Sequence, residues 1–585
     1  MFEMKKSPWL GIVFMSMSLG MVSCVDSKYD LDKDIDWTIS AGGEYLALPV
    51  GSTDTAFLSK IIDVEEDGML AVNGNHEYHL TKQDDIAVEP TSVEKVEIEE
   101  IDSDLDPVTI VGEGMENRGA HSTEVRAKVE TTGKFEKEVI GVDAALKELG
   151  ALTAETPSVL TVSFNFSSEG GLTYDEVRSE NLVLIFPDFL QFEENQPVRD
   201  NRLDLSDVVL SSFPSETKEI SLKVKGYQFS EKAGGSQAQK PVDGTFLILG
   251  EIKAEGFVKT TGVQNAETGK LELALKTVLT PMTVNQVIGV IQPEINVDDT
   301  DIELNGLPEF LKDEDTRLDL TNPVFMFKAT NNLKTEVVID VAMTPQRAGK
   351  DLSQNTVTVT GLQLAPEAET LIALSCTGES GIVGAQDKKV DDINNLMEII
   401  PDFINVALDP RVENDQYYEA DLGVDYEMPS SYDVDVPLSF ESGLNIVYKD
   451  SISDLNKDLL DLDKVDFNVA NLIFNAVNTI PLQMEMKPEN VEIKDVYGNI
   501  IEDILVESDG NKIAESKDGK EEVESEFALK LTSDEPGVLS RIERICFKVT
   551  AVSGQATGVP LKDTQWLKLT KIKLNVPGGV KVDLN

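Results

Sequence analysis

Residues 158–166 read SVLTVSFNF, and apolar side chains alternate with polar ones through most of the stretch. A period of two turns one face of a strand into a core and the other face toward water, which is typical of an antiparallel sheet. Similar runs occur at 219–229 (EISLKVKGYQF), 270–278 (KLELALKTV) and 568–576 (KLTKIKLNV). These runs predict a mainly β fold of antiparallel sandwiches with a few short helices.

Turn and helix patterns are fewer than strand patterns. Asn and Gly tolerate positive φ, so residues 72–75 (VNGN) predict a hairpin turn. The segments 141–152, 284–291 and 393–400 are the candidate short helices. Because helical segments are so few, we expect layers of sheet rather than alternating strand–helix–strand units.

Short motifs recur along the chain. PDFL (187–190) is followed by RLDL (202–205), and PEFL (308–311) is followed by a second RLDL (317–320). Both RLDL segments alternate apolar and charged residues before a Ser or Thr. Arg202 and Arg317 lie 115 residues apart. A motif that recurs in the same order indicates internal duplication.

Two further pairs of segments resemble each other in the same chain order. Residues 284–297 (VNQVIGVIQPEINV) resemble 393–406 (INNLMEIIPDFINV) with one residue deleted. Residues 327–345 resemble 474–488, and in both a strand that ends in Asn leads through a turn to a strand that ends before Pro. We interpret the three echoes together as tandem duplication.

The spacing of the echoes predicts tandem β-sandwich modules of about 100 to 120 residues. A chain of 585 residues is also too long for a single core. The predicted division is a signal peptide at 1–23, a lipid-anchored acidic tether at 24–40, an N-terminal β domain at 41–155, β-sandwich modules at 156–280 and 281–390, and one or two C-terminal β-sandwich modules at 391–585.

The first residues have the pattern of an export signal. Lys5 and Lys6 precede a mostly apolar run at 9–19, which is too short to span a bilayer as a mature helix. The following MVSC (21–24) resembles the bacterial lipobox. This resemblance implies cleavage before Cys24 and attachment of a diacylglycerol and a further acyl chain such as palmitate. The alternative is an ordinary secretory signal with a chance cysteine.

Two longer segments resemble a family of envelope proteins. Residues 24–53 (CVDSKYDLDKDIDWTISAGGEYLALPVGST) and 432–452 (YDVDVPLSFESGLNIVYKDSI) are similar to uncharacterised outer-membrane lipoproteins of gut Bacteroidetes. Residues 322–341 (NPVFMFKATNNLKTEVVIDV) resemble the sandwich strands of water-stress (LEA-type) domains. The resemblance implies β architecture and a lipid-anchored place on the outer membrane, surface-exposed or on the periplasmic face. It implies no activity and no functional residues.

The charge of the chain limits its partners. With 51 Lys and Arg against 106 Asp and Glu, the net charge is −55. Such a surface repels phosphate backbones, so we expect no nucleic-acid partner. The partners that we expect are the membrane, through the N-terminal lipid, and a protein or glycan at the cell surface.

The three cysteines do not make a disulfide framework. Cys24 is assigned to the lipid. Cys376 and Cys546 lie in apolar, strand-like surroundings, where free cysteines behave as small hydrophobes. Export would also permit a bridge between them, so the sequence leaves their pairing open.

No metal or cofactor site is predicted. The histidines are His76, His79 and His121, and residues 76 and 79 of a strand face opposite sides, so they could not jointly hold zinc. The alternating aspartates of 30–36 lack the Gly and Glu of a calcium loop. Calcium bound diffusely or between modules stays open.

Catalytic motifs are also lacking in the sequence, with no G-x-S-x-G and no phosphate-binding loop. We therefore predict no catalytic residues and no enzymatic activity. Tyr417, Tyr418 and Tyr432 form an aromatic group in a polar segment and are the candidate ligand-binding residues. The expected role is non-catalytic binding, adhesion or assembly. The alternatives are a glycan-binding component of a surface nutrient-uptake complex and a carboxylate-dependent hydrolase on a β scaffold.

Overall fold

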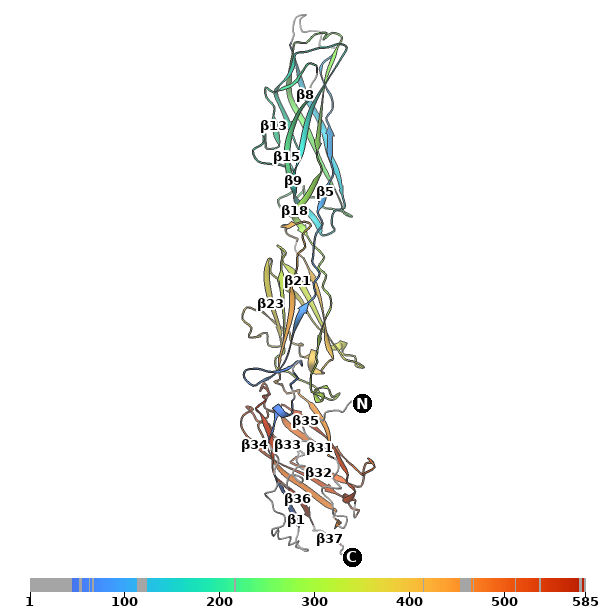
Figure 1. Cartoon of the computed structure of the whole chain (residues 1–585), viewed down its shortest axis with the longest axis vertical. Helices are drawn as coiled ribbons and strands as arrows, with labels where there is room; N and C mark the ends of the chain where they lie inside the picture. The colour runs from blue at the N-terminus through green and yellow to red at the C-terminus, as the bar shows by residue number, and fades with distance from the viewer. Residues whose placement is uncertain are drawn as a thin grey trace.

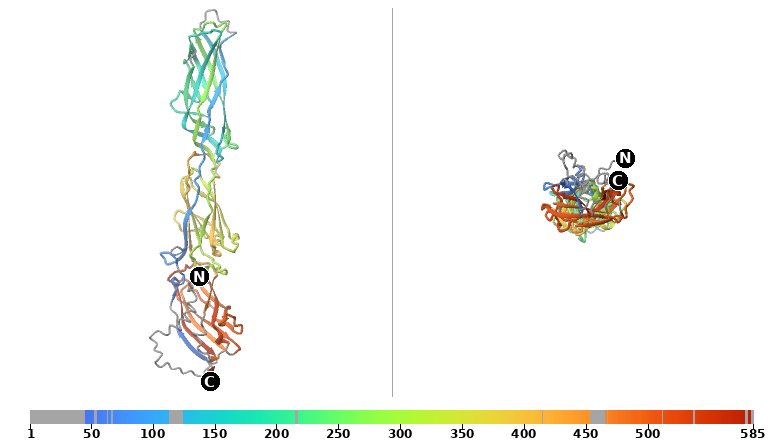
Figure 2. Two further views of the ribbon diagram at one scale, coloured as in Figure 1. Left: turned by 45° about the vertical axis from the view of Figure 1, so that its right-hand side comes forward. Right: turned by 90° about the horizontal axis from the view of Figure 1, so that it is seen from below.

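The described part of the chain forms a rod of three stacked β units, which we name the base, middle and tip units (Figure 1, Figure 2). The base unit contains both the first and the last described strands. The computed structural model describes residues 45–51, 55–62, 64–65, 68–112, 124–214, 217–413, 415–452, 465–466, 468–510, 512–535, 538–577 and 581–582.

Each unit is assembled from segments that are far apart in the sequence. The base unit contains β1 (Tyr45–Gly51), β2 (Ala56–Phe57), η2 (Leu58–Lys60), β28 (Ile446–Ile452), β29 (Val465–Asp466), β30 (Val469–Asn478), β31 (Gln483–Lys494), β32 (Leu505–Asp509), β33 (Lys512–Ile513), β34 (Val523–Thr532), η5 (Leu539–Arg541), β35 (Arg544–Val552), β36 (Trp566–Pro577) and β37 (Lys581–Val582). The middle unit contains β3 (Leu70–Val72), β4 (Tyr78–Ile86), β19 (Thr300–Glu303), η3 (Glu309–Lys312), β20 (Val324–Asn331), β21 (Val337–Gln346), η4 (Ser353–Asn355), β22 (Val357–Leu364), β23 (Ala368–Ser375), β24 (Gln386–Lys389), α2 (Asn395–Glu398), β25 (Phe403–Arg411) and β27 (Ser430–Pro437). The tip unit contains β5 (Val96–Ile98), β6 (Ile101–Asp104), β7 (Val108–Val111), β8 (Glu124–Ile140), β9 (Leu146–Glu169), β10 (Glu176–Ile185), β11 (Leu190–Phe192), β12 (Val198–Arg199), β13 (Arg202–Asp204), β14 (Val209–Ser212), β15 (Lys218–Gln228), β16 (Thr245–Thr261), β17 (Lys270–Leu279), β18 (Met282–Ile291) and β26 (Tyr418–Asp421).

The three units share one topology. One sheet has the order β34-β30-β36-β1 in the base, β23-β20-β27-β4 in the middle and β15-β9-β17-β6 in the tip. The facing sheet has the order β33-β31-β35-β28 in the base, β22-β21-β25-β19 in the middle and β13-β10-β16-β8 in the tip. The pairs along these orders are antiparallel, so the predicted fold class, antiparallel β sandwiches with few short helices, is confirmed.

The units are nested in one another. In the base, the whole of the middle and tip units is inserted between β1 and β28. In the middle, the tip segment β5 to β18 is inserted at the equivalent point, between β4 and β19. The N-terminal segment thus runs up the rod and gives strands to each unit in turn, β1 and β2 to the base, β3 and β4 to the middle and β5 to β7 to the tip (Figure 1). The chain then continues through the tip and the middle and ends in the base.

The nesting does not follow the division predicted from the sequence. The predicted domain at 41–155 supplies strands to all three units. The predicted C-terminal module at 391–585 contains β25 and β27 of the middle unit and β26 of the tip unit. The physical reason is that antiparallel pairing joins distant segments, as where β4 pairs with β27, and short local echoes carry no information on such pairing.

Local patterns explain most of the strands. Along β17 every second residue is buried, which is the predicted alternation of residues 270–278. The predicted hairpin at 72–75 is confirmed, because β3 pairs with β4 across it. Its turn is fixed by Asn73, whose Oδ1 accepts hydrogen bonds from the backbone N–H groups of Asn75 (2.8 Å) and Glu77 (3.0 Å).

Two of the three predicted helices are wrong. Most of 141–152 is the start of β9, and 284–291 lies within β18. The register between these two strands shifts at three places along β18, and a bulge sets two residues against one. At each bulge the alternation of apolar and polar residues is interrupted. The resulting spacing of apolar residues is similar to that of a helix. Within 393–400 the helix is confirmed as the single turn of α2.

Within the part of the chain that the structure describes, apolar side chains fill two continuous cores. One core occupies the tip, and the other runs without interruption through the middle and the base. Both RLDL segments bury their leucines, Leu203 and Leu205 in the tip core and Leu318 and Leu320 in the other. Their places in the topology differ, because the first forms β13 and the second lies outside the strands, between η3 and β20. Within the described residues, no helix is long and apolar enough to cross a membrane.

Candidate functional site

The junction between middle and tip is bridged by a segment that we name the strap (residues 415–426). It leaves the middle unit after β25 and returns to it at β27. On the way it adds β26 to the tip, where β26 pairs antiparallel with β18. Ala420 and Leu422 of the strap belong to the tip core. The strap is therefore a strand donated by one unit to the next.

Tyr417 fixes the start of the strap on the tip. Its hydroxyl donates a hydrogen bond of 2.7 Å to Oε1 of Glu148. Its ring lies against the backbone of Gly150, where a Cβ atom would come within 2.2 Å of the ring carbon Cε2. The ring position thus requires glycine at 150.

Glu148 is a buried carboxylate that receives three contacts. Besides Tyr417, the backbone N–H of Gly234 donates to Oε1 at 2.6 Å, and Nζ of Lys240 lies 3.2 Å from Oε2. Burial acts to raise the pKa of Glu148, but the hydrogen bonds from Tyr417, Gly234 and Lys240 outweigh it, so the pKa lies below its usual value. Glu148 is therefore held as an anion with all its partners in place.

The rest of the strap is held by polar bonds. The hydroxyl of Tyr418 donates to the carbonyl of Ile291 at 2.7 Å. Nζ of Lys334, from the middle unit, lies 2.8 Å from Oε1 of Glu419 and 3.6 Å from Oδ2 of Asp421. Tyr417 and Tyr418 therefore both help to join the middle unit to the tip unit.

A second loop bridges the base and the middle in a comparable way. We name residues 556–565, which connect β35 to β36, the collar loop. The backbone N–H of Tyr78 donates to the carbonyl of Leu561 (2.9 Å), and Lys562 pairs with Glu77 (3.0 Å). His76 Nδ1 lies 3.1 Å from Oδ1 of Asp563. In the base, the loop before β36 thus reaches the middle unit. In the middle, the strap before β27 reaches the tip unit in the same way.

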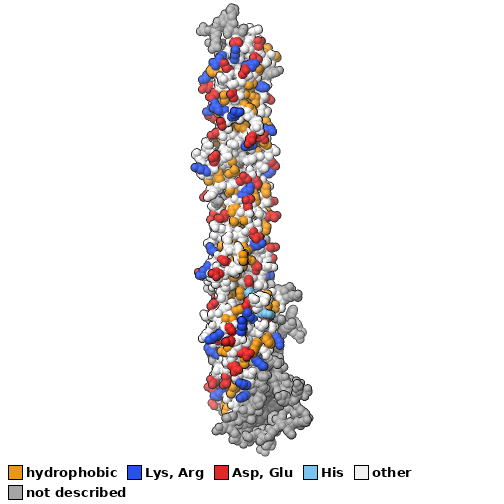
Figure 3. Space-filling view, turned by 90° about the vertical axis from the view of Figure 1, so that its left-hand side faces the viewer, with side chains coloured by type: hydrophobic (Ala, Val, Ile, Leu, Met, Phe, Trp, Pro, Cys, Tyr) orange, Lys and Arg blue, Asp and Glu red, His pale blue; other side chains and the backbone are white. Residues whose placement is uncertain are grey.

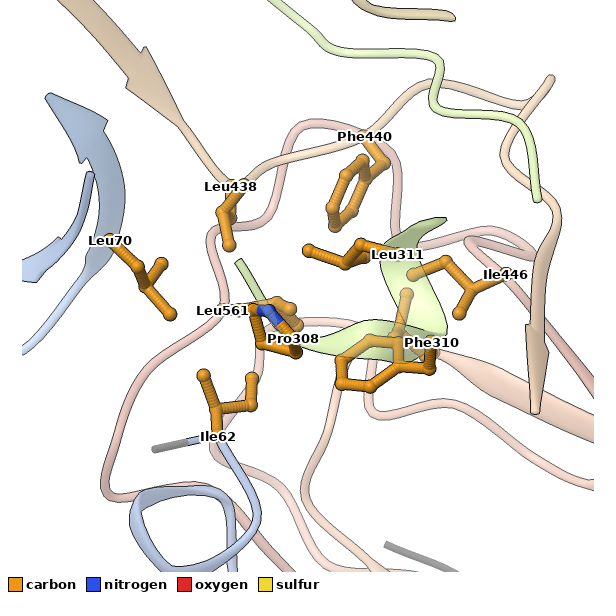
Figure 4. A pocket seen from close by; sticks show the side chains of 10 residues that line it. Ile62, Leu70, Pro308, Phe310, Leu311, Leu438, Phe440, Ile446 and Leu561 are labelled. Carbon is orange, nitrogen blue, oxygen red and sulfur yellow. The ribbon is translucent and has the colours of Figure 1, made fainter. Parts of the chain in front are cut away.

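An apolar pocket lies at the same junction (Figure 4). It is lined by Ile62, Leu70, Pro308, Phe310, Leu311, Leu438, Phe440, Ile446, Leu482 and Leu561. Its free volume is about 10 Å³, close to the minimum for one water molecule. These side chains come from both units, and all but Pro308 belong to their shared core. The pocket is therefore part of the packing that joins base and middle.

Carboxylates at this junction are paired with lysines. Asp313 and Asp315 of the middle unit face the base. Nζ of Lys449 lies 3.0 Å from Asp313, and Nζ of Lys548 lies 2.8 Å from Asp315. The hydrogen bond from Lys548 lowers the pKa of Asp315. Among the described residues, no group of three or more His, Cys, Asp or Glu is placed to hold a metal ion.

The three tyrosines predicted to bind a ligand are not brought together. Tyr418 lies in the tip sheet, whereas Tyr432 lies on β27 of the middle unit. Tyr432 is 3% exposed, and burial raises its pKa to about 12. The prediction of one aromatic group is therefore corrected: Tyr432 is a core residue, and Tyr417 and Tyr418 are strap residues.

The cysteines are only partly covered by the structure. Cys376 and Cys546 are free and half-buried, one after β23 of the middle unit and the other on β35 of the base. Burial raises the pKa of the Cys376 thiol. Cys24, the predicted lipid site, lies outside the described residues, and so do the signal peptide, the tether and His121.

Glu148 and Lys240 were not found from the sequence. The only pattern that could have pointed to Glu148 is its place between Leu146 and Leu149, where a carboxylate interrupts an apolar segment. Its partners come from positions about 90 and 270 residues further along the chain, and no local pattern links them.

No protein-family model matches the chain, and no curated protein matches it. A solved structure from Parabacteroides distasonis, of a protein proposed to be secreted, is 17% identical, with a TM-score of 0.33 over 50% of this chain and 83% of that one. A chain of Sulfolobus Turreted Icosahedral Virus is 8% identical, with a TM-score of 0.10 over 81% of this chain and 97% of that one.

Proposed function

We propose that this chain is a lipid-anchored, non-catalytic protein of the bacterial cell envelope whose rod holds the tip unit away from the membrane. The observation that supports it is the order of the units. The first described strand, β1, lies in the base, at the opposite end of the rod from the tip, so a chain anchored through Cys24 is joined to its anchor through the base (Figure 2).

The junctions support this role because a display rod must resist bending. The base and middle share one core, and the collar loop spans them. The strap gives the tip a strand from the middle, so separating the two would expose Ala420 and Leu422. A strand buried in a neighbouring unit is costly to withdraw, since both its apolar area and its backbone hydrogen bonds are lost.

The tip is the part of the rod that we assign to binding, adhesion or assembly. The side chains that the structure brings into buried polar contact, such as Glu148 and Tyr417, are engaged between units, which supports a non-catalytic role. On one face of the rod Lys and Arg lie among Asp and Glu along its length (Figure 3). With a net charge of −55, the partner is a protein or a glycan rather than a nucleic acid.

The outer membrane is the proposed location, on the resemblance of residues 24–53 to Bacteroidetes lipoproteins. Metabolic labelling with a palmitate analogue and envelope fractionation of the wild type and Cys24→Ser test the anchor. The wild type is expected to be labelled and to sediment with envelope, and the variant to do neither. Cys376→Ser is the matched control and should retain both. Labelling of Cys24→Ser equal to that of the wild type would refute the anchor.

A further inference from the structure

Four large apolar side chains are exposed within ten residues of the base unit. Val496, Tyr497, Ile500 and Leu505 are between 55% and 87% exposed, and we name them the apolar foot. They lie on and after the turn that follows β31. Soluble surfaces carry single exposed apolar residues without consequence, but a local cluster is typical of a contact surface.

The turn that carries the foot is well fixed. Oδ1 of Asp495 accepts hydrogen bonds from the backbone N–H groups of Tyr497 and Asn499, both at 2.9 Å. The backbone N–H of Asp495 donates in turn to the carbonyl of Asn499 at 2.9 Å. Gly498 has a φ of 85°, which an L side chain rarely adopts. The apolar side chains are therefore presented outward by a closed turn.

The foot lies at the end of the base unit that faces away from the middle. Leu505 pairs with Thr532, which pairs with Val469, the first residue of β30. Since β30 and β36 are antiparallel, the start of β30 lies beside the end of β36, where Pro577 pairs with Tyr45. The foot and the point where the chain enters the rod are thus at the same end.

We propose that the apolar foot contacts the lipid surface that carries the anchor, with Tyr497 and its aliphatic neighbours at the boundary between headgroups and acyl chains. This inference rests on the proposed function, because the anchor on Cys24 is what brings the base to the membrane. Residues 25–44 separate Cys24 from β1. An extended chain of these twenty residues spans at most about 70 Å, which is the greatest distance between the anchor and the start of β1.

The chemistry of the foot favours a zwitterionic lipid surface. Tyr is enriched at the boundary between membrane and water, because its ring is apolar and its hydroxyl remains hydrated. Glu502 and Asp503 are exposed between Ile500 and Leu505 and would be repelled by anionic headgroups. A weak contact suffices, since a tether raises the effective concentration of the base at the membrane.

Depth-dependent quenching tests the contact without the native lipid. The chain 25–585, with Cys24 replaced by an N-terminal hexahistidine tag, is bound to phosphatidylcholine vesicles that contain a nickel-chelating lipid. The variants are Tyr497→Trp and, as matched control, Val383→Trp, whose parent side chain is 98% exposed on the middle unit. Trp37 and Trp566 contribute the same background to both.

Brominated phosphatidylcholine is expected to quench the Tyr497→Trp indole at least about twofold more than the Val383→Trp indole, because bromine quenches only at acyl-chain depth. Equal quenching in the two variants would overturn the proposal. Adding Val496→Ser and Ile500→Ser should remove the difference, and replacing about a third of the lipid with phosphatidylserine should reduce it.

The two proposals fail separately. Because the tag supplies the tether, the quenching result does not depend on acylation of Cys24. An unlabelled Cys24 with strong quenching would refute the anchor alone, whereas a labelled Cys24 with equal quenching would refute the foot alone.

Discussion

Asn331 and Asn478 occupy equivalent positions in the middle and base units and have three hydrogen bonds in common. Both side chains are completely buried, at the ends of β20 and β30. In each, Oδ1 accepts from the backbone N–H two residues later, at 2.9 Å. Each Nδ2 also donates to the carbonyl four residues later and to a carbonyl on the far side of the unit. The side-chain amide of each asparagine therefore stabilises the turn that connects the two sheets of its unit.

Replacing Asn331 by Ala is expected to lower the free energy of unfolding by about 2 to 4 kcal/mol, because several buried backbone groups lose their partner. Asn478→Ala should have a similar effect on the base. Asn332→Ala, at an exposed neighbouring position with one hydrogen bond, is the control and should cost less than about 1 kcal/mol. Chemical denaturation measures all three. Equal free energies of unfolding for Asn331→Ala and Asn332→Ala would contradict the stabilising role of the buried Asn331 amide.

The strap gives a second prediction. Tyr417→Phe keeps the ring against Gly150 but removes the hydrogen bond to Glu148, so the tip should lose about 1 to 2 kcal/mol of stability. Hydrogen exchange of β26 and β18 should accelerate in this variant and stay unchanged in Tyr497→Phe, whose side chain is exposed. Unchanged exchange in both variants would show that the bond contributes nothing to the junction.

The pH dependence of the tip follows from Glu148. Its pKa in the folded chain lies below the usual value of 4.5. A lowered carboxyl pKa gives stability that is fully present above about pH 6 and is lost as pH falls through the folded pKa. Thermal unfolding of the wild type and Glu148→Gln should therefore differ most near neutral pH and converge below pH 4.5. If the difference in stability between the wild type and Glu148→Gln grew as the pH fell, the prediction would be wrong.

The sequence was sufficient for features that depend on neighbours in the chain. The alternation in 270–278, the turn at Asn73 and the strand-ending asparagines at 331 and 478 are all local, and the structure confirms them. The echo of 327–345 in 474–488 falls on equivalent strand pairs, β20–β21 in the middle and β30–β31 in the base.

Features that depend on distant partners were missed. The nesting requires pairings such as that of His79 with Pro437, and neither residue indicates the other. A bulge of β18 between Val284 and Gln286 breaks the period of two, so the spacing in 284–291 predicts a helix where the structure has a strand. Tyr417 was noted as an aromatic residue, but its role depends on Glu148, which is 269 residues away in the chain.

The free cysteines give a further prediction. The unfolded Cys24→Ser chain should show two reactive thiols without reductant, because Cys376 and Cys546 are unpaired and lie in different units. Titration with a thiol reagent in denaturant measures this number. If no reactive thiol were found, Cys376 and Cys546 would form a disulfide. The middle and base units would then have a different arrangement relative to each other.

Nesting itself makes the two ends of the tip segment adjacent. The backbone N–H of Glu89 donates to the carbonyl of Asn296 at 3.0 Å, just below the tip. The whole segment 93–291 could therefore be replaced by a short Gly-Ser linker without straining the middle unit, provided that Ala420 and Leu422 of the strap are changed to Ser. Removing the predicted tandem module 156–280 instead would take strands out of both tip sheets.

Thermal unfolding of these two deletion variants, followed by circular dichroism, tests the nested architecture most directly. The chain without 93–291 is expected to keep its β spectrum and a cooperative transition of the middle and base. The chain without 156–280 should also lose its tip and expose apolar surface to a fluorescent dye. Loss of cooperative unfolding on removal of 93–291, together with a well-folded chain after removal of 156–280, would contradict nesting and favour tandem modules.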